Sequence, residues 1–219
     1  MQTGYFTPDT RAPGQRLRYA RFAAEGQPVG TVLLCSGRTE FIEKYRETIC
    51  DLQKRDLDVW SFDWRGQGLS SRQVLNPHKG YIDHFDTYLE DMRLFIQQEF
   101  LPQSQSPRIV LAHSMGGHIS LRHLHDHPDS FEGAVLSAPM LQINSAPFPK
   151  HLMQAMTRVS CFLGLEQSYA PSQHRYDERD EQFAGNRLTS DSSRFSAMVQ
   201  DVHENPSLAL GGVTNGWIQ

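Results

Sequence analysis

The sequence predicts an α/β fold in which a mostly parallel sheet carries helices on both faces and is followed by a helical cap. Three observations lead to this prediction. Short apolar runs alternate with amphipathic segments between residues 17 and 136, as in sheets whose strands are joined by helices. One run leads directly into Ser114 and two glycines, which is typical of a sharp strand-to-helix turn. After Pro139 the strand pattern stops, and residues 140–212 are polar, helical in spacing and rich in Met and Gln.

Five strands and three helices are expected before Pro139. An early strand is expected at residues 17–22, and buried strands of the parallel-sheet type at residues 31–35, 59–62, 109–112 and 133–136. Amphipathic helices are expected at residues 41–54, 81–101 and 115–125. The last helix should stop near Pro128, since proline cannot occupy a helix interior. Right-handed crossovers then place helices on both faces of the sheet.

The expected organisation has three parts. Residues 1–139 are the N-terminal part of the sheet core, residues 140–212 are a cap inserted over its carboxyl edge, and residues 213–219 begin the return to the core. We expect further strands beyond Gln219, missing from this sequence. Without them the strand at residues 133–136 is an exposed apolar edge, which proteins avoid because such edges promote aggregation.

Composition excludes several classes of protein. The chain has 219 residues with 38 % apolar and 21 % charged side chains, which fits one globular domain. Its net charge of -4 offers no basic surface for nucleic acid.

No secretory signal is readable, and no apolar run approaches the roughly 20 residues of a spanning helix, so a cytoplasmic protein with at most peripheral membrane contact is expected. The three cysteines, at wide spacing, predict reduced buried thiols. Oligomeric state is unreadable.

The residues around Ser114 carry the strongest chemical signal. They read IVLAHSMGG from residue 109 to residue 117, a buried strand running into a serine and then into a glycine-started helix. A catalytic serine needs such a tight turn, and small residues such as Ala112, Gly116 and Gly117 let the strand and the helix pass closely. Ser114 is therefore the expected nucleophile. The alternative, a serine that only caps the helix, would not need the two glycines.

An acyl-transfer serine also needs two backbone N–H donors for the oxyanion of its tetrahedral intermediate. One comes from the residue after the nucleophile, which is Met115. The second is expected from Arg38, in the loop SGRTE at residues 36–40, because Gly37 lets the backbone approach closely. The alternative for this loop is an ordinary strand-to-helix turn.

These segments carry a family resemblance. Residues 112–117 resemble the G-H-S-M-G-G elbow of monoglyceride lipases, and residues 36–40 are similar to their H-G-x-x-E segment, with Ser36 and Phe41 where that family has histidines. The sequence DWRGQGLS at residues 63–70 matches the D-x-R-G-x-G-x-S turn of α/β hydrolases, and we assign its Asp63 and Arg65 to structure. Residues 186–191, 194–195 and 210–217 resemble bacterial lysophospholipase L2. The chain thus resembles the lysophospholipase and monoglyceride lipase branch (serine aminopeptidase S33 type) of the α/β hydrolases.

The resemblance implies a triad in the chain order Ser, acid, His. The acid and the base are expected beyond Gln219. His113 should point away from the Ser114 hydroxyl, because neighbouring side chains in an extended segment point opposite ways. Among the histidines of this sequence, His203, with Asp201 and Glu204 beside it, is the first candidate to replace the missing base of the triad.

In the cap, Phe148, Leu152, Val159 and Phe162 share one helical stripe, with Met156 alongside. Leu152, Met156 and Val159 either line an acyl-chain pocket or simply pack on the sheet.

The resulting hypothesis is a serine hydrolase that cleaves carboxylic esters of lipids with a single acyl chain, such as lysophospholipids or monoacylglycerols, through an acyl-enzyme on Ser114. No metal or organic cofactor is implied. An acyltransferase or thioesterase on the same scaffold remains open, and so does a non-catalytic lipid- or protein-binding module that lacks the acid and the base.

Overall fold

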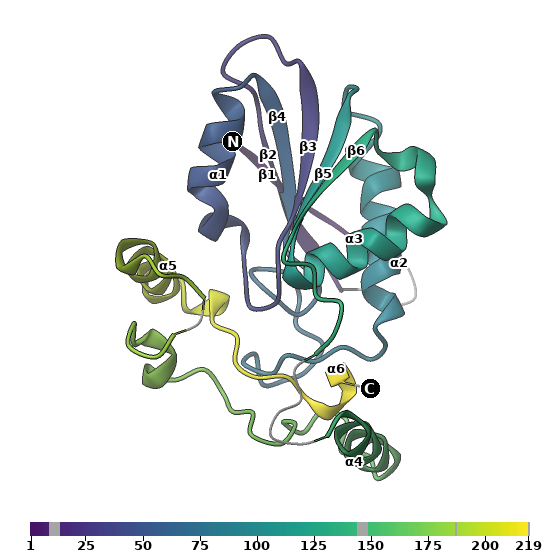
Figure 1. Ribbon diagram of the computed structural model, residues 1–219, viewed down its shortest axis with the longest axis vertical. Coiled ribbons are helices and arrows are strands. Elements are labelled where there is room, and N and C mark those ends of the chain that lie inside the picture. Colours follow the sequence, from purple (N-terminus) through teal and green to yellow (C-terminus); the bar gives the residue numbers. More distant parts are fainter. Residues whose placement is uncertain (9–13, 144–148, 187, 219) are drawn as a thin grey trace.

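A six-stranded sheet forms the centre of the molecule (Figure 1). The structure is a computed structural model that describes residues 1–8, 14–143, 149–186 and 188–218. The strand order is β1-β2-β4-β3-β5-β6, with β1 and β2 antiparallel to their neighbours and β4, β3, β5 and β6 mutually parallel. The strands are β1 (Gln2–Phe6), β2 (Leu17–Phe22), β3 (Gly30–Cys35), β4 (Leu57–Phe62), β5 (Arg108–His113) and β6 (Gly133–Ser137). All five predicted strands are present, and β1 is an addition that the sequence analysis missed.

Helices cover both faces of the sheet, as predicted (Figure 1). On one face lies α1 (Arg46–Gln53), preceded by a 3-10 turn at Ile42–Tyr45. On the other face lie α2 (Asp86–Phe95), extended by a π-helical turn at Ile96–Phe100, and α3 (Ser114–Asp126). The helix predicted from residue 81 begins only at Asp86. Its start is set by Asp83, whose carboxylate accepts hydrogen bonds from the His84 N–H and the Thr87 hydroxyl at 2.9 Å each.

The core is asymmetric about the sheet. The larger cluster lies between the sheet and the α2–α3 layer, where the rings of Phe62 and Phe95 are 4.7 Å apart and Trp60 meets Phe100 edge-on. A smaller cluster fills the side covered by α1. A third cluster joins Phe41, in the loop after β3, to Val202 of the cap. The cap is thus packed directly against the loop that was predicted to supply an oxyanion donor.

The cap lies across the carboxyl end of the sheet (Figure 1). Its elements are α4 (Lys150–Phe162), a 3-10 turn at Glu178–Glu181, α5 (Ser192–Glu204), a 3-10 turn at Pro206–Leu208 and α6 (Asn215–Ile218). Single β-bridges join Val213 to Gly80 of the sheet domain and Thr214 to Tyr169 of the cap. We propose that the cap ends at residue 212, because residues 213 and 214 connect the two parts.

Two expectations about the whole chain can be compared with the structure. No helix in the described part of the chain has the length and apolar character needed to cross a membrane. The three cysteines are free, but only Cys35 is buried. Cys50 is exposed on the outer face of α1 and Cys161 is half-buried, so the prediction of buried thiols is wrong for these two.

Candidate active site

Ser114 lies on a strained turn between β5 and α3. Its φ angle of 49° is in the left-handed region, which a residue with a side chain adopts at a cost of about 1–3 kcal/mol. A Cβ atom on Gly116 would lie 2.6 Å from the Cys35 carbonyl oxygen and closer still to that of Ser36. Glycine is therefore required where α3 passes the end of β3. The fully buried Ala112 supplies the small residue on the strand side.

The loop after β6 closes on the same turn. The Met140 N–H donates a hydrogen bond of 2.9 Å to the Ser114 carbonyl oxygen. A Cβ atom on Gly117 would lie 3.0 Å from Pro139, so α3 also passes closely here. The small residues predicted to shape the elbow thus fit contacts with two different neighbouring loops.

The loop at residues 36–40 leaves one backbone donor free. The Gly37 N–H donates to Glu40 Oε2 at 2.6 Å, and the Thr39 N–H donates to Gln67 Oε1. Among the described residues nothing accepts a hydrogen bond from the Arg38 N–H between them. Met115 is the second residue of α3, and N–H groups in the first turn of a helix have no partner within the helix. Both predicted donors are therefore available to a ligand.

This loop rests directly on the elbow. A Cβ atom on Gly37 would lie 3.2 Å from Cδ2 of His113, the residue that precedes the nucleophile. The Ser36 carbonyl oxygen faces Gly116 and also accepts a hydrogen bond of 2.7 Å from Trp64 Nε1. The structure therefore brings together the two segments that the sequence analysis singled out.

Glu40 braces the loop, a role that the sequence analysis missed. Its carboxylate is buried and accepts hydrogen bonds from the Gly37 N–H, the Lys44 ammonium and the Tyr45 hydroxyl. Burial alone would raise the pKa of Glu40, but Lys44 and these hydrogen bonds hold it below its usual range. The Glu40–Lys44 spacing of four residues is a signal that could have been found in the sequence.

The glycine-rich turn at residues 63–70 is structural, but its two charged residues do not pair with each other. Asp63 is buried and accepts hydrogen bonds from Arg18 Nε at 2.7 Å and from the Ile42 N–H at 3.1 Å. Arg65 instead pairs with Asp91 of α2 at 2.6 Å. Each buried charge has its own partner, and Asp63 holds the start of the segment that follows the SGRTE loop.

No histidine ring among the described residues hydrogen-bonds the Ser114 hydroxyl. The Nδ1 atom of His113 lies 3.1 Å from the Ser137 carbonyl oxygen, so this side chain is turned toward β6. His203 is mostly exposed on α5, and its Nε2 atom lies 2.8 Å from Glu181. The structure therefore gives no support to His203 as a substitute base. The acid and base predicted beyond Gln219 lie outside the described residues.

Leu152, Met156 and Val159, the predicted acyl-pocket residues, line neither of the two cavities that lie between the cap and the sheet domain. Leu152 and Val159 are 43 % and 58 % exposed, Met156 is partly exposed, and Phe148 lies outside the described residues. The helix α4 instead buries Met153 and Thr157, one residue away on the adjacent face. Thr157 can be buried because its hydroxyl donates to the Met153 carbonyl oxygen at 3.1 Å.

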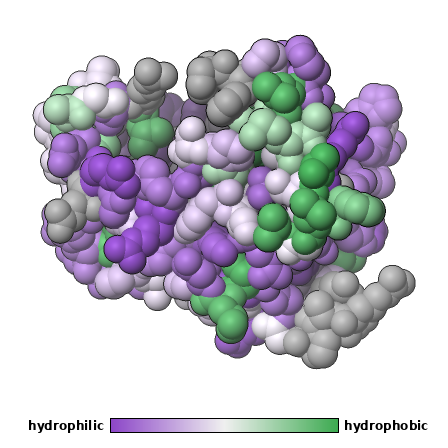
Figure 2. Space-filling model, turned by 90° about the horizontal axis from the view of Figure 1, so that it is seen from below, coloured by the Kyte–Doolittle hydropathy of each residue, from purple (hydrophilic) through white to green (hydrophobic). Residues whose placement is uncertain are grey.

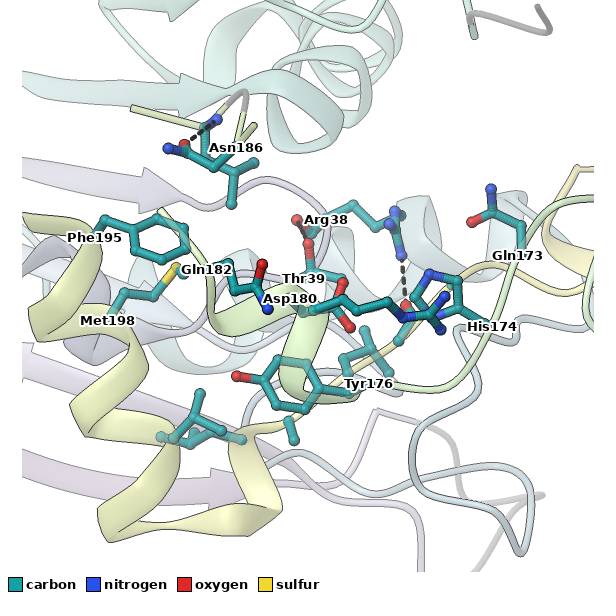
Figure 3. A pocket seen from close by; sticks show the side chains of 18 of the residues that line it. Arg38, Thr39, Gln173, His174, Tyr176, Asp180, Gln182, Asn186, Phe195 and Met198 are labelled. Carbon is teal, nitrogen blue, oxygen red and sulfur yellow. Dashed lines mark hydrogen bonds between the residues drawn. The ribbon is translucent and has the colours of Figure 1, made fainter. Parts of the chain in front are cut away.

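Two cavities lie between the cap and the sheet domain. The α4 cavity, of about 490 Å³, is lined by apolar side chains, including Phe85, Met140, Met153 and Trp217, and by polar ones, including Asp83, His118, Lys150 and Arg158. The α5 cavity, of about 440 Å³, is lined by Arg38 and Thr39 of the loop at residues 36–40, the predicted oxyanion loop, and by residues of α5 and the preceding turn (Figure 3). Ser114 itself lines neither cavity. It is linked to the first through Met140 and to the second through the loop that carries Arg38.

One group of side chains has metal-ligating atoms close together. The ligand atoms of His174, Asp177 and Asp180 lie within 4.8 Å of one another. Arg179 already pairs with the Asp177 carboxylate, and the Asp180 carboxylate accepts a hydrogen bond of 2.9 Å from the Asp177 N–H. We assign no metal to them.

The chain is similar to known lipid esterases in sequence. It is 34 % identical to lysophospholipase L2 of Escherichia coli K12 over 203 residues, which is 93 % of this chain and 59 % of the relative. It is 26 % identical to the monoglyceride lipase of Rattus norvegicus over 133 residues, 61 % of this chain and 42 % of the relative. The chain therefore spans less than two thirds of the length of these proteins.

Solved structures show the same fold. A thermostable carboxyl esterase from Bacillus coagulans superimposes with a TM-score of 0.66 at 18 % identity, covering 100 % of this chain and 72 % of that one. A monoglyceride lipase from Saccharomyces cerevisiae gives 0.66 at 18 % identity over 98 % of this chain and 65 % of that one. The predicted α/β-hydrolase fold is confirmed. Residues 26–219 match the family described as serine aminopeptidase, S33, and the chain belongs to this family of α/β hydrolases.

Proposed function

We propose that this chain carries the nucleophile of a serine hydrolase that cleaves carboxylic esters of lipids with a single acyl chain, lysophospholipids or monoacylglycerols. The observation that carries the proposal is the left-handed conformation of Ser114 at the junction of β5 and α3. The names of the similar proteins, a lysophospholipase and a monoglyceride lipase, support the substrate class.

The proposed reaction follows from the donors around Ser114. The Ser114 oxygen attacks the ester carbonyl carbon while a base takes its proton, and the carbonyl oxygen becomes an oxyanion. The N–H groups of Arg38 and Met115 donate to this oxyanion, each contributing on the order of 3 kcal/mol of transition-state stabilisation. The intermediate then releases the alcohol, which takes up the proton, and water hydrolyses the acyl-serine to the fatty acid.

We propose that the base and its acid come from a part of the protein outside residues 1–219. In the part of the chain that the structure describes, no histidine ring hydrogen-bonds the Ser114 hydroxyl, and His113 and His203 are turned to other partners. General acid–base assistance is typically worth about 10²–10⁴-fold. Without it, Ser114 should turn over esters only slowly.

We propose the α4 cavity as the acyl-chain site, in place of the surface formed by Leu152, Met156 and Val159. Its lining includes the pliable Met140 and Met153 and the ring of Trp217, beside polar side chains such as Lys150 and Arg158. It also adjoins the elbow, since the Met140 N–H bonds to the Ser114 carbonyl oxygen.

The exposed stripe of α4 favours a peripheral contact with a lipid surface. Phe162 is 90 % exposed and Val159 58 %. The helix also carries Lys150 and Arg158 but no acidic residue, although the chain as a whole has a net charge of -4. Figure 2 shows hydrophobic residues gathered on one side of the cap face. An apolar stripe with basic flanks is typical of helices that lie at a membrane interface.

The experiment that tests the catalytic proposal is active-site labelling of the full-length gene product. A fluorophosphonate should modify one residue, Ser114, as mapped by mass spectrometry, and Ser114→Ala should lose both the label and turnover of a short-chain ester. Ser193→Ala, at the start of α5, is the matched control and should keep both. Activity of Ser114→Ala within a few-fold of wild type would show that another residue is the nucleophile. Labelling of wild type at the background rate would favour the non-catalytic module instead.

A further inference from the structure

The side chain of Arg38 has an environment that its backbone role does not explain. It extends from the oxyanion loop into the α5 cavity (Figure 3). Its Nη1 donates one hydrogen bond, of 3.1 Å, to the Gly211 carbonyl oxygen, and its guanidinium lies 6.0 Å from the centroid of the Trp217 ring. A guanidinium has five N–H donors. Among the described residues no carboxylate lies within the 4.0 Å range of an ion pair with Arg38, so most of its donors are free.

Three other arginines near this site have anionic partners, whereas Arg72, like Arg38, donates only to carbonyl oxygens among the described residues. Arg18 binds Glu43 and Asp63, and Arg65 binds Asp91. Across the α5 cavity, Arg179 is held by Asp177. A guanidinium that is partly buried without a carboxylate is costly, and burial lowers the pKa of Arg38 from its usual value. Such a site becomes favourable when a ligand supplies the anion.

We propose that the Arg38 guanidinium binds the phosphate of a lysophospholipid head group in the α5 cavity. The proposal rests on the esterase function proposed above and assigns the head-group side of the same site. A planar guanidinium with free N–H groups suits a phosphate, which accepts two parallel hydrogen bonds from it. Thr39 and Gln173 add polar side chains to the same cavity.

The position of the guanidinium suits the shape of the substrate. The Arg38 N–H is a proposed donor to the oxyanion. The guanidinium of the same residue lies at most the length of one arginine side chain from this N–H. In a 1-acyl lysophospholipid a glycerol backbone of similar length separates the ester carbonyl from the phosphate. One residue can therefore contact both ends of the glycerol unit, while the acyl chain leaves toward the α4 cavity. Trp217, which lines that cavity, faces the guanidinium from the other side.

If the Arg38 side chain had a purely structural role, replacing it would have a different effect on hydrolysis. The hydrogen bond from Arg38 to Gly211 links the oxyanion loop to the end of the cap. If this link is the only role of the side chain, replacing it weakens hydrolysis of charged and neutral esters by the same factor. A phosphate site instead weakens hydrolysis of the phosphorylated ester selectively.

The test compares two esters with one acyl chain, 1-palmitoyl-lysophosphatidylethanolamine and 1-palmitoylglycerol, in the full-length gene product. For Arg38→Gln we expect the ratio of kcat/KM for the lysophospholipid to that for the monoacylglycerol to fall about 10- to 100-fold, mainly through KM. Arg38→Lys should restore part of the ratio, because an ammonium binds phosphate as a point charge. Arg55→Gln, the matched control, changes an exposed arginine that lies outside the α5 cavity and should leave the ratio unchanged. An unchanged ratio in Arg38→Gln overturns the proposal.

A second arm measures binding without turnover and distinguishes a head group from free phosphate. In Ser114→Ala protein, glycerol 3-phosphate should bind by calorimetry. Adding Arg38→Gln should abolish this binding, while Arg55→Gln should not. Binding of inorganic phosphate with an unchanged substrate ratio would identify a free-phosphate site and overturn the head-group assignment. If wild type hydrolyses neither ester, the proposed function fails, and this binding arm alone decides whether Arg38 holds a phosphate.

Discussion

Replacing Gly116 by alanine should disable the site while leaving the protein folded. The added Cβ would lie 2.6 Å from the Cys35 carbonyl oxygen and 2.9 Å from its carbonyl carbon, and closer still to the Ser36 carbonyl oxygen. Ordinary contacts of this kind are about 3.5 Å or longer. The obstacle is the backbone of β3, which pairs with strands on both sides, so α3 must move away by about 1 Å.

That movement carries Ser114, two residues earlier, away from the Arg38 donor. A displacement of about 1 Å in an active site can cost about 10²-fold in rate, and the loss of one oxyanion donor costs about 10²–10³-fold in kcat. We therefore expect kcat of Gly116→Ala to fall by about two orders of magnitude. Overpacking of this kind destabilises by about 1–3 kcal/mol, so cooperative unfolding should persist at a lower midpoint.

The assay is kcat on a short-chain p-nitrophenyl ester, measured beside urea unfolding. The matched control is Gly133→Ala on β6, where the added Cβ would meet only Cδ1 of Ile109, at 2.9 Å, and a side-chain end can move. Its kcat should stay within a few-fold of wild type. If Gly116→Ala unfolds cooperatively and also keeps kcat within a few-fold, the close passage of α3 does not position the nucleophile, and the reasoning is refuted.

Two further predictions concern the loop and the pH dependence of stability. Gly37→Val should lower kcat without unfolding the protein, because its Cβ would lie 2.8 Å from Glu40 Oε2 and displace the loop that carries the Arg38 donor; an unchanged kcat would remove this loop from the oxyanion hole. Burial and the neighbouring His127 lower the pKa of the buried His123 to about 4, against about 6.5 in the unfolded chain. Between these two pKa values the unfolded state binds more protons than the folded state does. The free energy of unfolding therefore has its full value above pH 6.5 and falls by up to about 3 kcal/mol as the pH approaches 4. Urea unfolding at pH 7.5 and 5 should show this loss in wild type and a smaller loss in His123→Gln, and equal losses would contradict the assignment.

The parts of the fold that were predicted are those with a strong local pattern. The strands β3 to β6 each contain a short run rich in apolar residues, which can be recognised without knowledge of the neighbouring strands. β1 was missed because Gln2–Phe6 is mostly exposed at the sheet edge, and only its antiparallel pairing with β2 makes it a strand. The strand order likewise depends on contacts between segments far apart in the chain, which no periodicity in the sequence contains.

The stripe on α4 shows the limit of periodicity most clearly. Leu152 and Val159 satisfy the helical spacing of a buried face, yet the helix buries Met153 and Thr157. The two faces are one residue, or about 100°, apart, and both contain apolar side chains. The choice between them is made by the surface on which the helix packs, which includes Trp217, about sixty residues later in the chain.

The sequence identified the residues of the candidate site but not the contacts that support them. The elbow is a contiguous motif, so Ser114 and its glycines could be read directly. The contacts that align the two proposed donors come from elsewhere, and they converge on the end of β3. Gly116 holds α3 against the carbonyl oxygens of Cys35 and Ser36, while Glu40 holds the Gly37 N–H on the other side of the same strand end. Both proposed donors are therefore positioned from the end of β3. The loop that carries Arg38 is also tied to the cap, through the Arg38–Gly211 hydrogen bond and the cluster of Phe41 with Val202, so a shift of the cap should move the Arg38 donor relative to Met115.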